Sequence, residues 1–195
     1  MRVILRKNIQ GFGVKERKMQ TTPWHNYALI THLAGKNISN LGKTKLQKLV
    51  FFLKAVKNIP VDYGYRFYTY GPYCDELSGD ISYLEDVKAL DISSDINGFG
   101  FVIREGEKSA FMKNKARDFL AKFENDINDI IEKFKNKNAN EMELLSTIVY
   151  LNKREEVCRA NKRCLVEKIK ELKPHFSLSK IESGIEELSS FGYLD

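Results

Sequence analysis

Two segments that lie 104 positions apart share one pattern of apolar residues. The matching positions are Leu77, Ile81, Leu84, Val87 and Leu90-Asp91 in the first segment and Ile181, Ile185, Leu188, Phe191 and Leu194-Asp195 in the second. Both spacings are those of one helix face, and both end in an extended Leu-Asp. A winged-helix unit has such a third helix before its wing, so the repeat favours two tandem helix-turn-helix-like units. The alternative is two amphipathic helices in one larger α-rich domain.

The residues around the first copy show the element order of a winged-helix unit. Asn97-Gly98 is a dipeptide favoured in type I′ turns, and it predicts a hairpin directly after the helix. The predicted helices are Trp24–Ala34, Gly42–Asn58 and Tyr73–Leu90, with an extended segment at Tyr63–Tyr70 and the hairpin strands at Asp91–Ile96 and Phe99–Arg104.

A long helix is predicted at Phe111–Lys135, where apolar residues alternate by four and three positions as in a coiled coil. This seam comprises Ala116, Leu120, Phe123, Ile127, Ile130 and Phe134. It is compatible with a homodimer formed through Phe111–Lys135 and, equally, with packing into the core of its own chain. Further helices are expected at Glu141–Asn152, Glu155–Leu172 and Leu178–Phe191.

The predicted fold is therefore mainly α with one small β hairpin, in which tandem winged-helix-like units are joined by a long helix. The expected divisions are a basic N-terminal arm (1–22), a winged-helix-like unit (23–110), a connecting helix (111–137) and a C-terminal helical, winged-helix-like unit (138–195).

The formal net charge of +6 is unevenly distributed along the 195 residues. Residues 1–18 have a net charge of +5, and their cations are Arg2, Arg6, Lys7, Lys15, Arg17 and Lys18. By contrast, the predicted third helices are acidic: Tyr73–Leu90 has five acids and one lysine, and Leu178–Phe191 has three acids and one lysine. That sign is wrong for a helix that enters a DNA groove. A DNA-binding regulator would have to use the arm and the lysine-rich helix Gly42–Asn58.

Motifs for catalysis, cofactors and metals are not found in the sequence. His25, His32 and His175 have no carboxylate or cysteine at metal-ligand spacing, and no phosphate-binding loop or nucleophile–base set is recognisable. The three cysteines are sparse and odd in number, which is typical of reduced thiols in a cytoplasmic protein. The longest apolar run, Leu49–Leu53, is too short to cross a membrane. We therefore expect a cytoplasmic protein that is not an enzyme and has no cofactor.

Two motifs carry a resemblance to a known family. The helix motif runs from Gly42 to Leu53 and contains Lys45-Leu46-Gln47-Lys48, and the turn motif runs from Tyr68 to Leu77 and contains Tyr70-Gly71-Pro72-Tyr73. Over residues 24–195 the chain resembles the YwgA-like family of uncharacterised prokaryotic proteins, and it is more distantly similar to the Panacea (SocA-like) antitoxin domain. Cys74 stands where the YwgA-like pattern usually has Ser, so no role is carried over to that thiol.

The resemblance implies a function in protein–protein contact. The Panacea domain neutralises toxins by binding them, and the matching positions here are Lys43, Lys45, Gln47, Lys48, Tyr70, Gly71, Pro72 and Tyr73. The same residues also have a purely structural interpretation, because Gly-Pro fixes the direction of the chain between a strand and a helix. The sequence thus predicts an antitoxin-like interaction module that is not an enzyme and binds a toxin or regulator protein. The alternative is a winged-helix DNA-binding transcriptional regulator.

Overall fold

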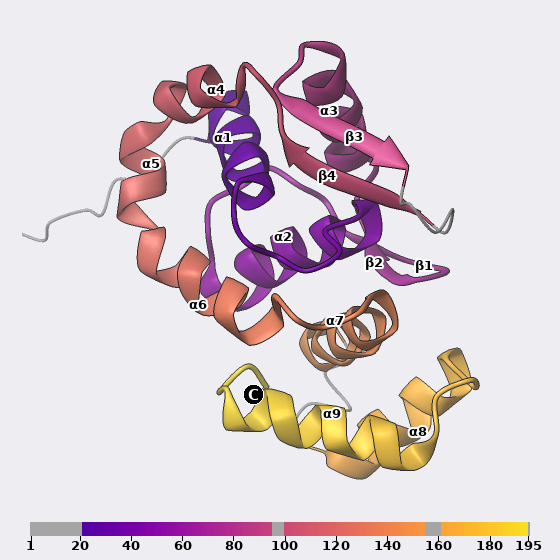
Figure 1. The fold of residues 1–195 in the computed structure, drawn as a ribbon. Helices are drawn as coiled ribbons and strands as arrows, with labels where there is room; N and C mark the ends of the chain where they lie inside the picture. The colour runs from indigo at the N-terminus through magenta and orange to yellow at the C-terminus, as the bar shows by residue number, and fades with distance from the viewer. Residues whose placement is uncertain (1–20, 95–99, 155–160, 195) are drawn as a thin grey trace, which may run out of the picture.

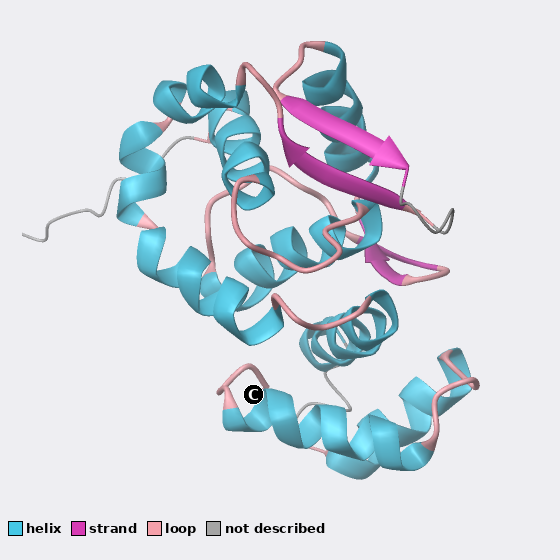
Figure 2. Cartoon of the chain, in the orientation of Figure 1, coloured by secondary structure: helices cyan, strands magenta, loops and turns pink. Residues whose placement is uncertain are grey.

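The computed structural model describes residues 21–94, 100–154 and 161–194 and is mainly helical, with two small antiparallel hairpins (Figures 1 and 2). The N-terminal elements are α1 (Pro23–Ala34), α2 (Lys43–Lys57), β1 (Arg66–Tyr68), β2 (Gly71–Tyr73), α3 (Asp75–Asp86), β3 (Leu90–Ser94) and β4 (Phe101–Glu105). They are followed by α4 (Ser109–Lys115), α5 (Arg117–Lys122), α6 (Glu124–Phe134), α7 (Ala139–Arg154), α8 (Lys162–Leu172) and α9 (Leu178–Ser190). No helix in these described ranges has the length and apolar character needed to cross a membrane.

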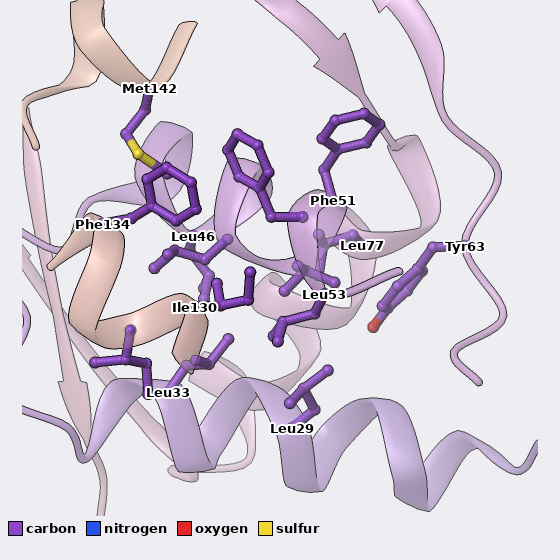
Figure 3. Packing of buried hydrophobic residues seen from close by; sticks show 14 of the residues in the cluster. Leu29, Leu33, Leu46, Phe51, Leu53, Tyr63, Leu77, Ile130, Phe134 and Met142 are labelled. Atoms are coloured by element: carbon purple, nitrogen blue, oxygen red, sulfur yellow. The ribbon is translucent and has the colours of Figure 1, made fainter. Parts of the chain in front are cut away.

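Helix α2 lies at the centre of the fold, in contact with α1, α3, α6, α7 and both hairpins (Figure 1). The helix predicted at Gly42–Asn58 is confirmed, and three of its leucines at helical spacing, Leu46, Leu49 and Leu53, are fully buried. Figure 3 shows Leu46 and Leu53 within the packed core. The helix begins after Gly42, which is extended, and ends at Asn58, which adopts the left-handed conformation with φ 54°. The ring of Phe52 stacks on Phe134 of α6 at a centroid distance of 4.3 Å, so α6 closes one side of the core.

The segment between α2 and α3 differs from the prediction. Gly71-Pro72 does not end an extended segment but forms β2, which pairs with β1 so that Tyr68 lies opposite Gly71. Gly71 allows this tight reversal because its φ is +83°, a value that residues with a Cβ rarely adopt. The helix predicted at Tyr73–Leu90 is therefore shorter. It begins at Asp75, after Cys74, whose sulfur accepts a hydrogen bond from the Leu77 N–H, and it ends at Asp86.

The two hairpin strands predicted at Asp91–Ile96 and Phe99–Arg104 are confirmed as β3 and β4. β3 and β4 pair antiparallel with Ile92 opposite Ile103, and the Asn97-Gly98 turn lies outside the described residues. The basic arm likewise falls outside them, apart from residues 21 and 22. The order of three helices and a hairpin matches the winged-helix expectation, but the β1–β2 hairpin interrupts it. The winged-helix architecture therefore stays a prediction.

The prediction of one long connecting helix is wrong, because the segment Phe111–Lys135 is divided among α4, α5 and α6. The helix breaks at Ala116, with φ −136° and ψ 38°, and at Phe123, with φ −106° and ψ 12°. A straight helix of this length would extend about 37 Å and leave the curved surface of the core. The two breaks let α4 and α5 follow α1 and let α6 follow α2 (Figure 1).

The residues of the predicted coiled-coil seam are used inside the chain. Ala116, Ile127, Ile130 and Phe134 are buried, and Leu120 and Phe123 pack partly against the same core. A seam that is already covered has no apolar stripe left for a second copy. The structure therefore favours packing within the chain over a homodimer through this segment.

The two copies of the repeat, which lie 104 positions apart, also share the backbone geometry of their helix ends. Lys88 after α3 and Gly192 after α9 both adopt positive φ, 63° and 71°. The same two hydrogen bonds close both ends, in the Schellman arrangement. These bonds run from Ala89 N–H to Leu84 O, Lys88 N–H to Glu85 O, Tyr193 N–H to Leu188 O and Gly192 N–H to Ser189 O. The repeated sequence pattern thus encodes one helix-and-cap unit that the chain uses twice.

The cysteines are not all reduced. Cys74 is a free, buried thiol, and burial raises its pKa to about 12. Cys164 is disulfide-bonded, so the expectation of three reduced thiols is wrong for this residue.

Candidate partner-binding site

Of the five lysines of α2, all but Lys43 bind groups of their own chain. Lys45 donates to the carbonyl oxygens of Ser39 and Lys135 at 2.7 and 2.6 Å, and Lys48 donates to the Pro72 carbonyl at 2.6 Å. Lys54 binds two further carbonyls, and Lys57 pairs with two carboxylates of α6. Lys45, Lys48 and Lys54 therefore each bind backbone carbonyl oxygens of neighbouring segments. This helix presents no row of free lysines to an acidic partner or to phosphate.

Gln47 is part of the same internal framework. Its amide nitrogen donates to the Cys74 carbonyl at 2.8 Å, and its oxygen accepts from the Cys74 N–H at 3.2 Å. This two-bond clamp holds the chain where β2 passes into α3. Lys45, Gln47 and Lys48 are only 2–3% exposed. Gln47 and Lys48 hold the segment Pro72–Cys74 from beneath and also line the hollow beside the hairpin. Lys45 instead binds the carbonyls of Ser39 and Lys135, away from the turn. Their predicted contact with a partner stays a prediction.

A buried ionic cluster that the sequence did not predict holds the other side of the hairpin. Glu143 of α7 pairs with Lys173 at 2.6 Å, and both side chains are 4% exposed. Lys173 also donates to the Thr69 carbonyl in the β1–β2 turn, and its ammonium lies 5.4 Å from the centre of the Phe67 ring. Burial lowers the pKa of nearby Lys48 to about 8, with Glu143 opposing the shift and Lys173 adding to it. Lysines from both halves of the chain thus fasten one short turn.

The turn also packs closely against α7. A Cβ placed on Gly71 would lie 2.9 Å from Thr147 Oγ1 and 3.4 Å from the Glu143 carbonyl oxygen. Pro72 is buried and presents its carbonyl to Lys48. Gly71 and Pro72 therefore lie on the inner side of the hairpin and face the core.

The outer side of the hairpin is exposed and aromatic. Tyr68 and Tyr70 are 51% and 62% exposed, and Tyr73 is half-buried. Arg66 lies over the Tyr68 ring at 4.6 Å and forms two hydrogen bonds with Asp75, at 2.8 and 3.2 Å. In Figure 1 the hairpin projects from the body of the molecule near the start of β4.

Lys43 connects this hairpin with β4. It is half-buried at the start of α2, and its ammonium lies 4.8 Å from the centre of the Phe101 ring, which is 51% exposed. Lys43 and the three tyrosines line a hollow of about 230 Å³. We call this surface the tyrosine face and define it as Lys43, Arg66, Tyr68, Tyr70, Tyr73 and Phe101. Of the sequence-predicted contact residues, it contains Lys43, Tyr70 and Tyr73.

The histidines do not form a metal site with their neighbours. Over residues 21–94, 100–154 and 161–194, no three His, Cys, Asp or Glu side chains are arranged to hold a metal ion. The ring of His25 stacks on Phe119 at 4.5 Å, and burial lowers the pKa of His32 to about 4. Both rings serve as packing groups.

No protein-family model and no curated protein matches this sequence. The similarity to the YwgA-like family and to the Panacea domain therefore stays a prediction. The structure gives the motif residues a physical role that does not depend on that similarity, because Gln47, Lys48 and Gly71 hold the hairpin that carries the exposed tyrosines.

Proposed function

We propose that the chain acts in the cytoplasm as a non-enzymatic interaction module, antitoxin-like in its mode of action, and that it binds a protein partner through the tyrosine face. One observation carries the proposal: Tyr68 and Tyr70 are largely exposed on a turn that is fixed from beneath by buried lysines. Tyrosine and arginine are the residue types that most often dominate binding energy at protein interfaces.

The fixed turn supports this function because rigidity lowers the entropic cost of binding. A hairpin with strands of only three residues, if it were not held in place, would lose conformational freedom when a partner ordered it. Here Lys48 and Lys173 bind the carbonyls of Pro72 and Thr69 on either side of Tyr70. The aromatic side chains are therefore presented in one arrangement before any partner arrives.

The DNA-binding alternative has less support. Of its two predicted contact surfaces, α2 uses its lysines internally, and the arm residues Arg2 to Lys18 lie outside the described part of the chain. The exposed residues of α3 include Asp75, Glu76 and Asp86, which would repel a phosphate backbone.

The proposal predicts that Tyr68→Ala/Tyr70→Ala abolishes a stoichiometric complex. Affinity-tagged wild-type chain, purified from native extract, should retain one protein partner, and the double variant should retain at least about tenfold less. Tyr83→Ala on α3 is the matched control, because Tyr83 is also a surface tyrosine at 44% exposure. Quantitative mass spectrometry of the eluates measures the ratio. The proposal is contradicted if the wild type retains no stoichiometric partner under several stress conditions, or if the double variant retains as much as the control.

A further inference from the structure

A second surface, formed by α4, α5 and the first turn of α1, combines cations with exposed rings. Its centre is a hollow of about 640 Å³ whose lining includes the charged side chains of Lys115, Arg117, Asp118 and Lys122 and the ring of His25. Lys115, Arg117 and Lys122 are exposed. Among the residues that the structure describes, Asp118 is the one carboxylate in this lining, and it is almost fully solvated at 3.7 Å from Arg117. The hollow therefore has a net positive field.

Two aromatic side chains lie beside these cations. Phe111 is 52% exposed and Trp24 is 37% exposed, and the two rings meet edge to face at 6.2 Å. The Lys115 ammonium lies 5.1 Å from the Phe111 ring centre and 5.5 Å from that of Trp24. His25, which also lines the hollow, stacks on Phe119 with an angle of 10° between the rings. Burial lowers the pKa of His25, so at neutral pH it offers a flat, uncharged ring.

We propose that this surface binds single-stranded nucleic acid. Cations that follow a phosphate backbone, together with rings on which bases stack, are the combination that recognises single strands. In a duplex the base faces are covered, so Phe111 and Trp24 would have nothing to stack on. An acidic polypeptide would satisfy the cations but leave the exposed rings without a planar partner. This function is separate from the proposed protein contact, because the tyrosine face shares no residue with this surface.

Charge reversal tests the phosphate contacts. A fluorescein-labelled oligothymidine of about 20 nucleotides should bind the full-length protein, and Lys115→Glu/Arg117→Glu should weaken binding at least about tenfold by fluorescence anisotropy. Lys162→Glu/Arg163→Glu on α8 is the control with the same change of charge on exposed side chains, and it should stay within about twofold of wild type. With three phosphate contacts, a fourfold rise in salt should lower the wild-type affinity about 20-fold.

Removing a ring tests the stacking separately. Phe111→Ala should weaken oligothymidine binding by about fivefold or more while leaving the salt dependence unchanged, because stacking contributes about 1–3 kcal/mol per base. The inference is overturned if neither the charge reversal nor Phe111→Ala weakens binding. It is also overturned if duplex DNA or poly-glutamate binds as tightly as the single strand, or if deletion of residues 1–18 alone abolishes binding. None of these results bears on the tyrosine face, which the co-purification experiment tests.

Discussion

Lys173→Met is expected to lower the free energy of unfolding by about 3–5 kcal/mol, because it removes the ammonium group that is hydrogen-bonded to the buried Glu143 carboxylate. The remaining basic neighbour at this carboxylate, His175 at 3.7 Å, is half exposed. The side chains of Lys173 and Glu143 are 4% exposed and 2.6 Å apart, and Lys173 also binds the Thr69 carbonyl. Urea denaturation followed by circular dichroism measures the change. Lys162→Met, which breaks the exposed pair with Glu186, is the control and should cost about 1 kcal/mol or less.

A second variant separates the loss of the ion pair from the loss of the lysine side chain. Lys173→Met/Glu143→Leu removes both charges, so it should recover part of the stability that Lys173→Met loses. The account of the ionic cluster is wrong if Lys173→Met costs no more than Lys162→Met, or if the double variant is no more stable than Lys173→Met.

Gly71→Ala is the second substitution with a large expected effect, a loss of about 2–5 kcal/mol of unfolding free energy. Two costs contribute: a left-handed backbone conformation in a residue with a Cβ, and a Cβ forced against Thr147 Oγ1 at 2.9 Å. Thermal unfolding should show a midpoint lower by several degrees.

Gly79→Ala is the matched control for this prediction, and its effect should have the opposite sign. Gly79 lies inside α3, and a Cβ there would meet nothing within 4 Å. Alanine should therefore stabilise the helix by up to about 1 kcal/mol. If Gly71→Ala is as stable as Gly79→Ala, the turn is not held against α7 as described.

Local patterns in the sequence predicted the local elements. The helix predicted at Gly42–Asn58 agrees with α2, and Asn97-Gly98 located the strands of β3 and β4. The repeat located α9 as a counterpart of α3, with the same helix cap. The breaks at Ala116 and Phe123 could not be predicted in this way, because they follow the curvature of a core made by other helices. The β1–β2 hairpin was missed because strands of three residues are too short to show an alternating pattern.

The candidate site was predicted only in part, because lysines are usually exposed. Six of the eight predicted contact residues line the surface hollow, namely Lys43, Gln47, Lys48, Tyr70, Gly71 and Tyr73. Lys45 and Lys48 are buried because carbonyls from distant segments, at Lys135 and Pro72, meet their ammonium groups. Such partners cannot be located from spacing along the chain. The Glu143–Lys173 pair, 30 residues apart, is hidden for the same reason.

The central claim is that the β1–β2 hairpin is a rigid platform for a protein partner. Amide hydrogen exchange, measured on the chain alone and in complex with the protein that co-purifies with it, tests this claim most directly. We predict new protection at residues 66–73 and around Lys43 in the complex, on a hairpin that is already ordered in the free chain. Protection confined to other surfaces, with exchange at residues 66–73 unchanged, would contradict the claim.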